Sequence, residues 1–528
     1  MGQIIPTKIS RFDGAMSDDP RQPSSNMGSL IKHFDCFSAP NKLTPYRSVE
    51  ADHTADSSST GAKTYDLRDF LLASNGKEYA LGKNASGYPK VLRKEDPTTG
   101  AWLASDGTAA ATAIGEGTAA RISGCFIEWQ GYLIFLEGTN QITKVLISTG
   151  VASSVGTVGS TITSVAQPII ANNTLYLFYN NKIVSISAAL AVSDNLFTTL
   201  PSDMRITSVA RFGAYLMLGM AFGSSNINKP VGRSIVVQWD MNSTTTPSDT
   251  LDWGEGALRV LGNIEGRICG VSDKYLSSSL GLTRGSMVVR LWAGGAPQVI
   301  KEVVANQTVT ADVTAFPNSV TRFPNQCVIK NNKMYWVASV PFGLSTSTES
   351  THHLGIWVFG RKTVNSDFTI SVDYIIDSVI DTANFRINSF GAAGDFWFLN
   401  HSADGSIAKT DDASTYSETS VYESQIFNAG DLASYKSLVD VTVGSVYLPT
   451  AGQIVVKYRI DNETSYTTIF TNTTDASISH TANNIESDGS ALPKKYKEIQ
   501  FQVLSTGGAE LTELSFNEEI TGRIYDTA

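Results

Sequence analysis

Six histidines are the first residues to consider for catalysis or metal binding, because imidazole serves both chemistries near neutral pH. They are His33, His53, His352, His353, His401 and His480. The adjacent pair His352–His353 lies in a Ser/Thr-rich stretch. Neighbouring residues of an extended chain point to opposite sides, so two adjacent histidines rarely bind the same metal ion. We therefore predict that both are solvated loop residues. The sequence has no His-x-x-x-His spacing and no Gly-x-Ser-x-Gly motif, which are the motifs of common metalloenzymes and hydrolases.

Carboxylates are the second group that could carry chemistry. The segment Ser402–Ser406 resembles the Asp-box turn of sialidases, but it lacks the closing aromatic residue and occurs once. We therefore predict an ordinary Asp-Gly hairpin turn. The pairs Asp18–Asp19 and Asp411–Asp412 lack the spaced oxygen ligands of a calcium loop. We expect no enzyme activity, no catalytic residues, no cofactor and no metal site.

The cysteines point to neither disulfides nor zinc. Cys36, Cys125, Cys269 and Cys327 lie far apart without a Cys-x-x-Cys pair. We predict four buried free thiols.

The elements that would position these residues are short strands joined by tight turns. The pentapeptide Ile-Thr-Ser-Val-Ala occurs at Ile162–Ala166 and again at Ile206–Ala210, 44 residues later. A period of about 40–50 residues built from strands is typical of β-propeller blades. Degenerate copies place Gly or Asn in a turn before a strand with an aromatic centre. The predicted aromatic blade-core residues are Tyr132, Tyr176, Tyr215, Tyr335 and Trp397.

These repeats predict an all-β fold with a β-propeller of seven blades, and six blades is the alternative. Ordinary β-meanders, which also build sandwiches and barrels, would give a similar pattern. The chain divides into residues 1–60, a proline-rich extended arm; 61–425, the propeller; and 426–528, where longer alternating strands predict a β-sandwich.

Composition restricts the function classes. The 528 residues carry a net charge of −10, and only 17% are charged. No Lys/Arg cluster is dense enough to track a phosphate backbone, which argues against nucleic-acid binding as the main task. The N-terminus has no secretory signal pattern, and no 18-residue apolar stretch predicts a membrane span.

The N-terminal segment resembles the opening of tail proteins of tailed bacteriophages. The resemblance rests on Phe12–Arg21, followed by Phe34-Asp35 and Leu43–Arg47. The nozzle type (tail tubular protein B) is the most similar in architecture. Gly14 is followed by Ala15 rather than by a second glycine, and the chain is shorter than typical nozzles. The residues that we assign to an assembly arm are Phe12, Gly14, Asp18, Pro20, Arg21 and Phe34.

The resemblance implies a structural virion protein, made in the host cytoplasm and assembled in several copies into a tail or neck ring that supports DNA passage. Its partners would be copies of itself and other virion proteins, such as the adaptor, portal-side or fibre proteins. The alternative is a carbohydrate-binding or carbohydrate-cleaving propeller that acts at the host cell surface.

Overall fold

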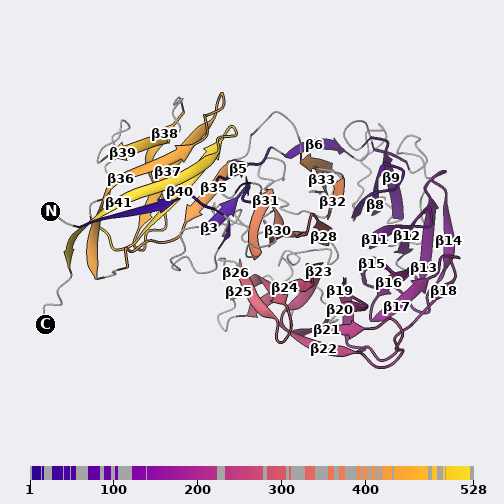
Figure 1. Cartoon of the computed structure of the whole chain (residues 1–528). Helices are drawn as coiled ribbons and strands as arrows, with labels where there is room; N and C mark the ends of the chain where they lie inside the picture. The colour runs from indigo at the N-terminus through magenta and orange to yellow at the C-terminus, as the bar shows by residue number, and fades with distance from the viewer. Residues whose placement is uncertain are drawn as a thin grey trace. The chain divides into compact units, whose positions relative to one another are not determined.

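The computed structural model shows an all-β chain with 41 strands and no helix in its described part (Figure 1). The described residues are 3–12, 15–16, 27–37, 39, 41–47, 49–54, 69–83, 89–96, 102–104, 122–137, 139–222, 232–277, 282–304, 309–310, 327–338, 355–361, 368–374, 389–393, 396–400, 406–410, 416, 419–430, 433–473, 479–483, 492–493 and 495–523. The chain forms two compact units. The propeller unit comprises Val49–Gly355 and Ile376–Thr410, and the sandwich unit comprises Met1–Ser48, Ile356–Ile375 and Asp411–Ala528.

The propeller unit is built from consecutive antiparallel sheets of four strands. The first sheet consists of β7 (Asp69–Leu72), β8 (Glu78–Lys83), β9 (Pro89–Lys94) and β10 (Trp102–Ala104), and the second of β11 (Ile122–Trp129), β12 (Tyr132–Glu137), β13 (Gln141–Leu146) and β14 (Ala152–Thr157). The third sheet consists of β15 (Val165–Ala171), β16 (Thr174–Tyr179), β17 (Lys182–Ile186) and β18 (Val192–Ser193), and the fourth of β19 (Met204–Phe212), β20 (Tyr215–Phe222), β21 (Arg233–Trp239) and β22 (Asp249–Glu255).

Two further sheets and one hairpin complete the unit. They are β23 (Ala257–Ile264), β24 (Arg267–Ser277), β25 (Leu282–Trp292) and β26 (Gln298–Val304), with β27 (Val309–Thr310) beside β25; the hairpin β28 (Cys327–Lys330) and β29 (Lys333–Ala338); and β32 (Ser389–Ala393), β33 (Phe396–Asn400), β34 (Ser406–Thr410) and β6 (Val49–Thr54). The described part of this unit therefore has six sheets with at least four strands and the hairpin β28–β29. The fold is a β-propeller, as the sequence predicts.

The first strand of each sheet packs against the first strand of the next. The contacts run from β7 to β11, β15, β19, β23 and β28, and β32 returns to β7. The rings of Tyr335 on β29 and Trp397 on β33 lie 4.6 Å apart and join the two remaining sheets. Gly391 permits the approach of β32 to β7, since a Cβ atom there would lie 2.4 Å from Cβ of Phe70. The six sheets and the hairpin thus close into a ring.

Hairpin turns inside the blades carry the residues that such turns require. Asn172 and Asn173 have φ angles of 50° and 56°, and Asn331 and Asn332 have angles of 51° and 57°. Two successive left-handed residues define a type I′ turn, which fits the twist of paired strands and favours Asn and Gly. The turn chemistry read from the sequence is confirmed at these positions.

The N-terminal segment is not a free arm, which corrects the prediction for residues 1–60. In the sandwich unit, β1 (Ile4–Ile9) pairs with β41 (Leu511–Arg523), and β3 (Met27–Lys32) pairs with β35 (Ser420–Ser424). In the propeller unit, β6 is the fourth strand of the last sheet, where Val49–Thr54 pairs with β34. The pairings β1–β41, β3–β35 and β6–β34 each join residues more than 350 positions apart, so the sequence near the segment gives little sign of them.

The sandwich unit consists of two main sheets. One has the order β1-β41-β36 (Ser434–Ser445)-β39 (Ser479–Asn483). The other runs β30 (Gly355–Arg361), β31 (Phe368–Tyr374), β3, β35, β40 (Ile499–Thr506), β37 (Gln453–Ile460) and β38 (Thr467–Asn472), with β2 (Ala15–Met16) beside β3; a small sheet joins β4 (Phe34–Asp35) to β5 (Thr44–Pro45). The buried rings of Phe501 and Phe516, one from each main sheet, lie 4.6 Å apart. The predicted boundary at residue 426 is therefore incomplete, because residues before 49 and around 356–375 also belong to this unit.

Candidate functional site: a pocket lined by the inner strands

Two predicted arm residues lie in the core of the sandwich unit. Phe12 is 1% exposed and its ring meets that of Tyr422 edge-on at 5.3 Å. Phe34 is fully buried, and Lys42 nearby forms an ion pair with Glu510 at 2.9 Å. These contacts are structural, so the two aromatic residues do not form a free assembly surface. The other arm residues, Gly14, Asp18, Pro20 and Arg21, lie outside the described residues.

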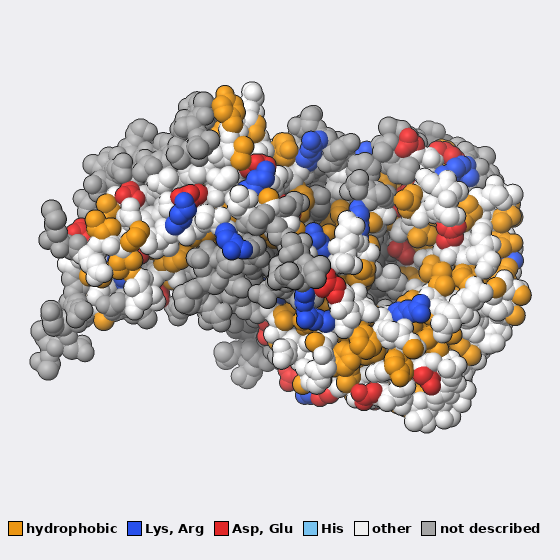
Figure 2. Space-filling view, in the orientation of Figure 1, with side chains coloured by type: hydrophobic (Ala, Val, Ile, Leu, Met, Phe, Trp, Pro, Cys, Tyr) orange, Lys and Arg blue, Asp and Glu red, His pale blue; other side chains and the backbone are white. Residues whose placement is uncertain are grey.

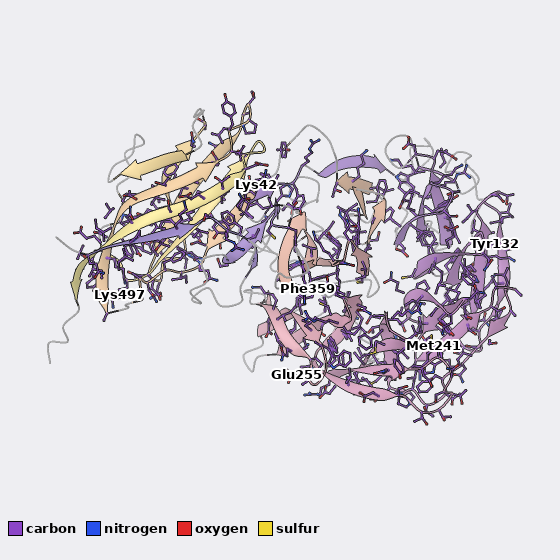
Figure 3. All side chains as sticks on the ribbon, viewed as in Figure 1. Lys42, Tyr132, Met241, Glu255, Phe359 and Lys497 are labelled. Carbon is purple, nitrogen blue, oxygen red and sulfur yellow. The ribbon has the colours of Figure 1, made fainter. Side chains whose placement is uncertain are left out.

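The predicted blade-core aromatics divide into two groups. Tyr176 and Trp397 are buried, and Tyr176 meets Trp239 of the next sheet edge-on at 5.7 Å. Tyr132, Tyr215 and Tyr335 are half-buried. Tyr132, labelled in Figure 3, lies under the ammonium group of Lys144 at 4.6 Å. The largest fully buried side chains outside the predicted core list are tryptophans: Trp102, Trp239, Trp253, Trp336 and Trp357.

Several chemistry-bearing candidates lie outside the described residues, namely His352, His353, His401, Asp404 and the pairs Asp18–Asp19 and Asp411–Asp412. Among the described residues, no three His, Cys, Asp or Glu side chains are grouped so that they could hold a metal ion. All four cysteines are buried and free, as predicted. No helix in the described part is long and apolar enough to cross a membrane.

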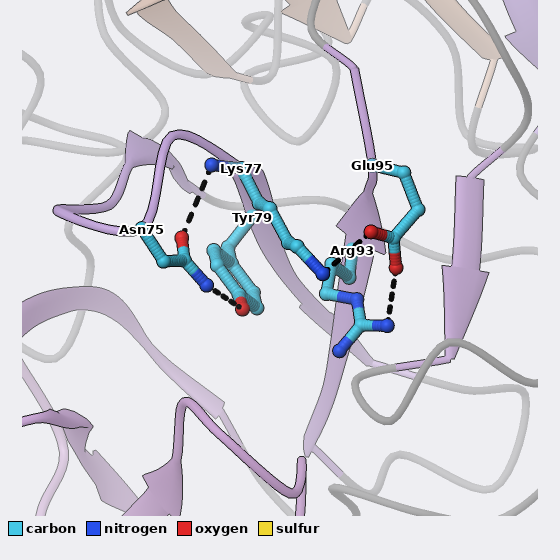
Figure 4. Close-up of polar contacts among 5 residues, drawn as sticks. All are labelled: Asn75, Lys77, Tyr79, Arg93 and Glu95. Atoms are coloured by element: carbon cyan, nitrogen blue, oxygen red, sulfur yellow. Dashed lines mark hydrogen bonds and ion pairs between the residues drawn. The ribbon is translucent and has the colours of Figure 1, made fainter.

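The β7–β8 turn is fixed by side chains that were not predicted to act there (Figure 4). Asn75 accepts a hydrogen bond from the Lys77 backbone at 3.1 Å and donates one to the Tyr79 hydroxyl at 3.0 Å. Lys77 forms an ion pair with Glu95 at 2.5 Å, and Arg93 also contacts that carboxylate. The hydrogen bond from Lys77, aided by Arg93, holds the pKa of Glu95 below its ordinary value.

A buried ionisable cluster lies beneath this turn. Glu78 on β8 is directly opposite Lys94 on β9, and both are fully buried. Lys94 lies over the rings of Trp102 and Phe398, at 5.9 and 5.2 Å. The carboxylate of Asp69 accepts hydrogen bonds from the backbone N–H groups of Phe70 and Phe126, at 3.0 and 3.2 Å.

Burial changes the protonation of both acids. It raises the pKa of Asp69 to about 8, against the lowering effect of its two backbone hydrogen bonds. Burial, with a contribution from Asp69, raises the pKa of Glu78 to about 9. Perturbed carboxyl pairs can mark active sites, but these two are enclosed in blade packing and neither lines the pocket described next. We assign the cluster a structural role.

The candidate site is a pocket of about 350 Å³ on the inner strands of four successive sheets. Strands β15, β19, β23 and β28 each contribute two or three residues. The lining consists of Gln167, Pro168, Ile169, Val209, Ala210, Arg211, Leu261, Gly262, Asn263, Cys327 and Ile329. Small-molecule sites have volumes of about 300–1,000 Å³ and are mostly apolar with a few placed polar groups, and this pocket has that composition.

Hydrogen bonds fix the polar side of the pocket. Asn263 Nδ2 donates to the carbonyl oxygen of Arg211 at 2.7 Å, and Asn263 Oδ1 accepts from the backbone N–H of Gly266 at 3.1 Å. Arg211 Nε donates to the carbonyl oxygen of Gly213 at 3.3 Å. The amide of Asn263 thus joins two blades and holds the backbone that carries Arg211.

The apolar side depends on a glycine and a thiol. A Cβ atom at Gly262 would lie 2.8 Å from Sδ of Met334 and 3.2 Å from Sγ of Cys327, so glycine permits this close packing. Burial raises the pKa of the Cys327 thiol to about 12, so the thiol is neutral at physiological pH. A neutral thiol is a poor nucleophile, and the described lining has no carboxylate. The geometry is suited to binding rather than to acid–base or nucleophilic chemistry.

Surface charge on the propeller unit is dispersed. On the face drawn in Figure 2, the Lys and Arg side chains of the described residues occur in small separate groups among hydrophobic and uncharged ones. The described residues on that face form no continuous basic surface of the kind that follows a nucleic-acid backbone.

No protein-family model matches the chain, and no curated protein matches it. Solved structures with a similar fold include the WD40 β-propeller domain of Doa1, with 9% identity, a TM-score of 0.37, and coverage of 70% of this chain and 98% of that one. BamB from Moraxella catarrhalis has 11% identity, a TM-score of 0.35 and coverage of 77% and 97%. YCF48 bound to D1 peptide has 10% identity, a TM-score of 0.40 and coverage of 72% and 100%.

Proposed function

We propose that this protein is a structural component of a tailed-bacteriophage virion, assembled in several copies in the tail or neck and without enzymatic activity. The observation that carries the proposal is that the N-terminal segment with the tail-protein resemblance contributes strands to both units. Strand β1 lies in the sandwich unit, and β6 closes the ring of the propeller unit.

This connectivity suits a part that must resist force. Each unit is closed by strands from opposite ends of the sequence, so neither can open without breaking a complete strand pairing. Closure of a propeller also protects the edge hydrogen bonds that would otherwise pair with other chains. A ring built from such subunits would stay rigid while DNA passes through it.

The turn between β36 and β37 offers a contact surface for virion partners. Val446 and Tyr447 at this turn are 41% and 66% exposed. Tyrosine is enriched at protein interfaces because one ring supplies a large apolar area and a polar tip. We propose that this turn contacts a second copy of the chain or a neighbouring adaptor, portal-side or fibre protein.

Measurements on purified phage particles test the proposal. Mass spectrometry of purified virions should detect the chain in several copies, and cryo-electron microscopy should show the propeller repeated around the tail axis. The gene should lie among portal, terminase and capsid genes. Absence from purified particles would contradict the proposal.

Carbohydrate binding or cleavage at the host surface remains the alternative function. Cleavage needs two carboxyl groups beside the glycosidic bond, and the described pocket lining has none. Binding and hydrolysis assays with host polysaccharide distinguish the two functions, because a structural protein gives neither signal.

A further inference from the structure

The pocket on the inner strands has a closed apolar side and an open side. Leu261 and Val209 are 3% and 7% exposed, whereas Ile329 is 46% exposed. Of these three aliphatic side chains, Ile329 is the exposed one, so a ligand would enter on its side and rest its body on aliphatic side chains.

One lining residue, Arg211, carries a positive charge. Arg211 is exposed, and its Nε atom is held by the carbonyl oxygen of Gly213. Among the described lining residues, Arg211 is the side chain that is charged at neutral pH, and its charge meets no carboxylate in the lining. The half-buried amide of Gln167 is the second polar group that a ligand could reach.

We propose that this pocket binds a small carboxylate carried on an aliphatic body. The carboxylate would contact the guanidinium of Arg211, and the body would pack against Val209 and Leu261. A planar guanidinium matches a carboxylate with two parallel hydrogen bonds, and the apolar body gains by leaving water. The hydrogen bonds of Asn263 hold the Arg211 backbone in place, so this site is preorganised.

The affinities of two matched probes test whether the charge of Arg211 contributes to ligand binding. We expect hexanoate to bind the full-length protein about tenfold or more tightly than hexanamide, which has the same length and no charge, because hydrogen bonds between charged groups are about twice as strong as neutral ones. In Arg211→Gln the preference for hexanoate should fall to about one. Arg205→Gln removes a charge from the same strand outside the pocket and should keep the preference.

Thiol protection provides a second readout at the pocket wall. Cys327 lines the pocket and is 7% exposed, and Cys125 is 6% exposed and lies outside it. Peptide mapping after maleimide labelling should show that hexanoate slows modification of Cys327 several-fold and leaves Cys125 unchanged. In Arg211→Gln this protection should disappear.

Equal affinity for the two probes, or an unchanged preference in Arg211→Gln, would overturn the proposal. Equal protection of Cys125 and Cys327 would also overturn it, because the probe would then slow labelling by reducing global unfolding rather than by occupying the pocket. The tests use the isolated protein, so their outcome is independent of whether the chain is found in virions.

Discussion

The buried carboxyl group of Glu78 allows a quantitative test of how the propeller unit is stabilised. Burial first, and then the charge of Asp69, raise its pKa from 4.5 to about 9, and Lys94 offsets only part of this effect. The folded protein therefore keeps a proton that the unfolded chain releases. Stability falls with pH wherever the folded state binds more protons, so the contribution of Glu78 is lost progressively between about pH 4.5 and pH 9.

The expected change in the free energy of unfolding follows from the interval between the pKa values of Glu78 in the unfolded and folded states. Each pH unit between the two pKa values costs about 1.4 kcal/mol. At pH 7 ionisation of Glu78 in the unfolded chain thus lowers the free energy of unfolding by about 3 kcal/mol. Glu78→Gln keeps the shape and cannot ionise, so it should stabilise the unit by about that amount at pH 7. For a unit of this size the melting temperature should rise by about 4 °C.

Thermal unfolding followed by circular dichroism between pH 4 and pH 8 is the assay. The melting temperatures of the wild type and Glu78→Gln should agree at pH 4 and separate as the pH rises. Glu95→Gln is the matched control, because Glu95 is exposed and its pKa is lowered; it should give no gain at pH 7. A lower melting temperature for Glu78→Gln at pH 7 would refute the reasoning. It would mean that Glu78 is ionised beside Lys94, whose buried charge the variant leaves uncompensated.

Three further predictions follow from the packing. Trp397→Ala should lower the free energy of unfolding by about 3–5 kcal/mol, measured by urea titration, because the ring contacts Tyr335 and Phe390 at 4.6 and 5.5 Å; a loss below about 1 kcal/mol would be inconsistent with a core position. Deleting residues 1–9 should lower the melting temperature of the sandwich unit, because β1 pairs along its length with β41; an unchanged melting curve would restore the free-arm interpretation. Tyr447→Asp should leave the melting temperature of the isolated protein unchanged and reduce incorporation into particles, quantified by mass spectrometry; normal incorporation would remove this turn from the assembly surface.

The local structure of this protein can be predicted from its sequence. Type I′ turns need residues that tolerate positive φ, so Asn172-Asn173 and Asn331-Asn332 locate hairpins without any knowledge of their surroundings. The repeated pentapeptide correctly indicated consecutive blades. Its period is not the structural one, however. The turns at Asn172 and Gly213 are 41 residues apart rather than 44, because the pentapeptide ends six residues before the first turn and three residues before the second.

How distant segments meet becomes visible in the folded chain alone. Strands β1, β3 and β6 resemble an unpaired arm in sequence, because their partners lie at the other end of the chain. The Glu78–Lys94 pair and the inner-strand pocket gave no sequence signal, because both depend on how strands pair and pack in three dimensions. The pocket combines Gln167, Arg211, Asn263 and Cys327 from four blades, and only closure of the ring brings these residues together. Local propensity follows from neighbouring residues, whereas a site formed across blades depends on packing between strands that are about 40–65 residues apart in the chain.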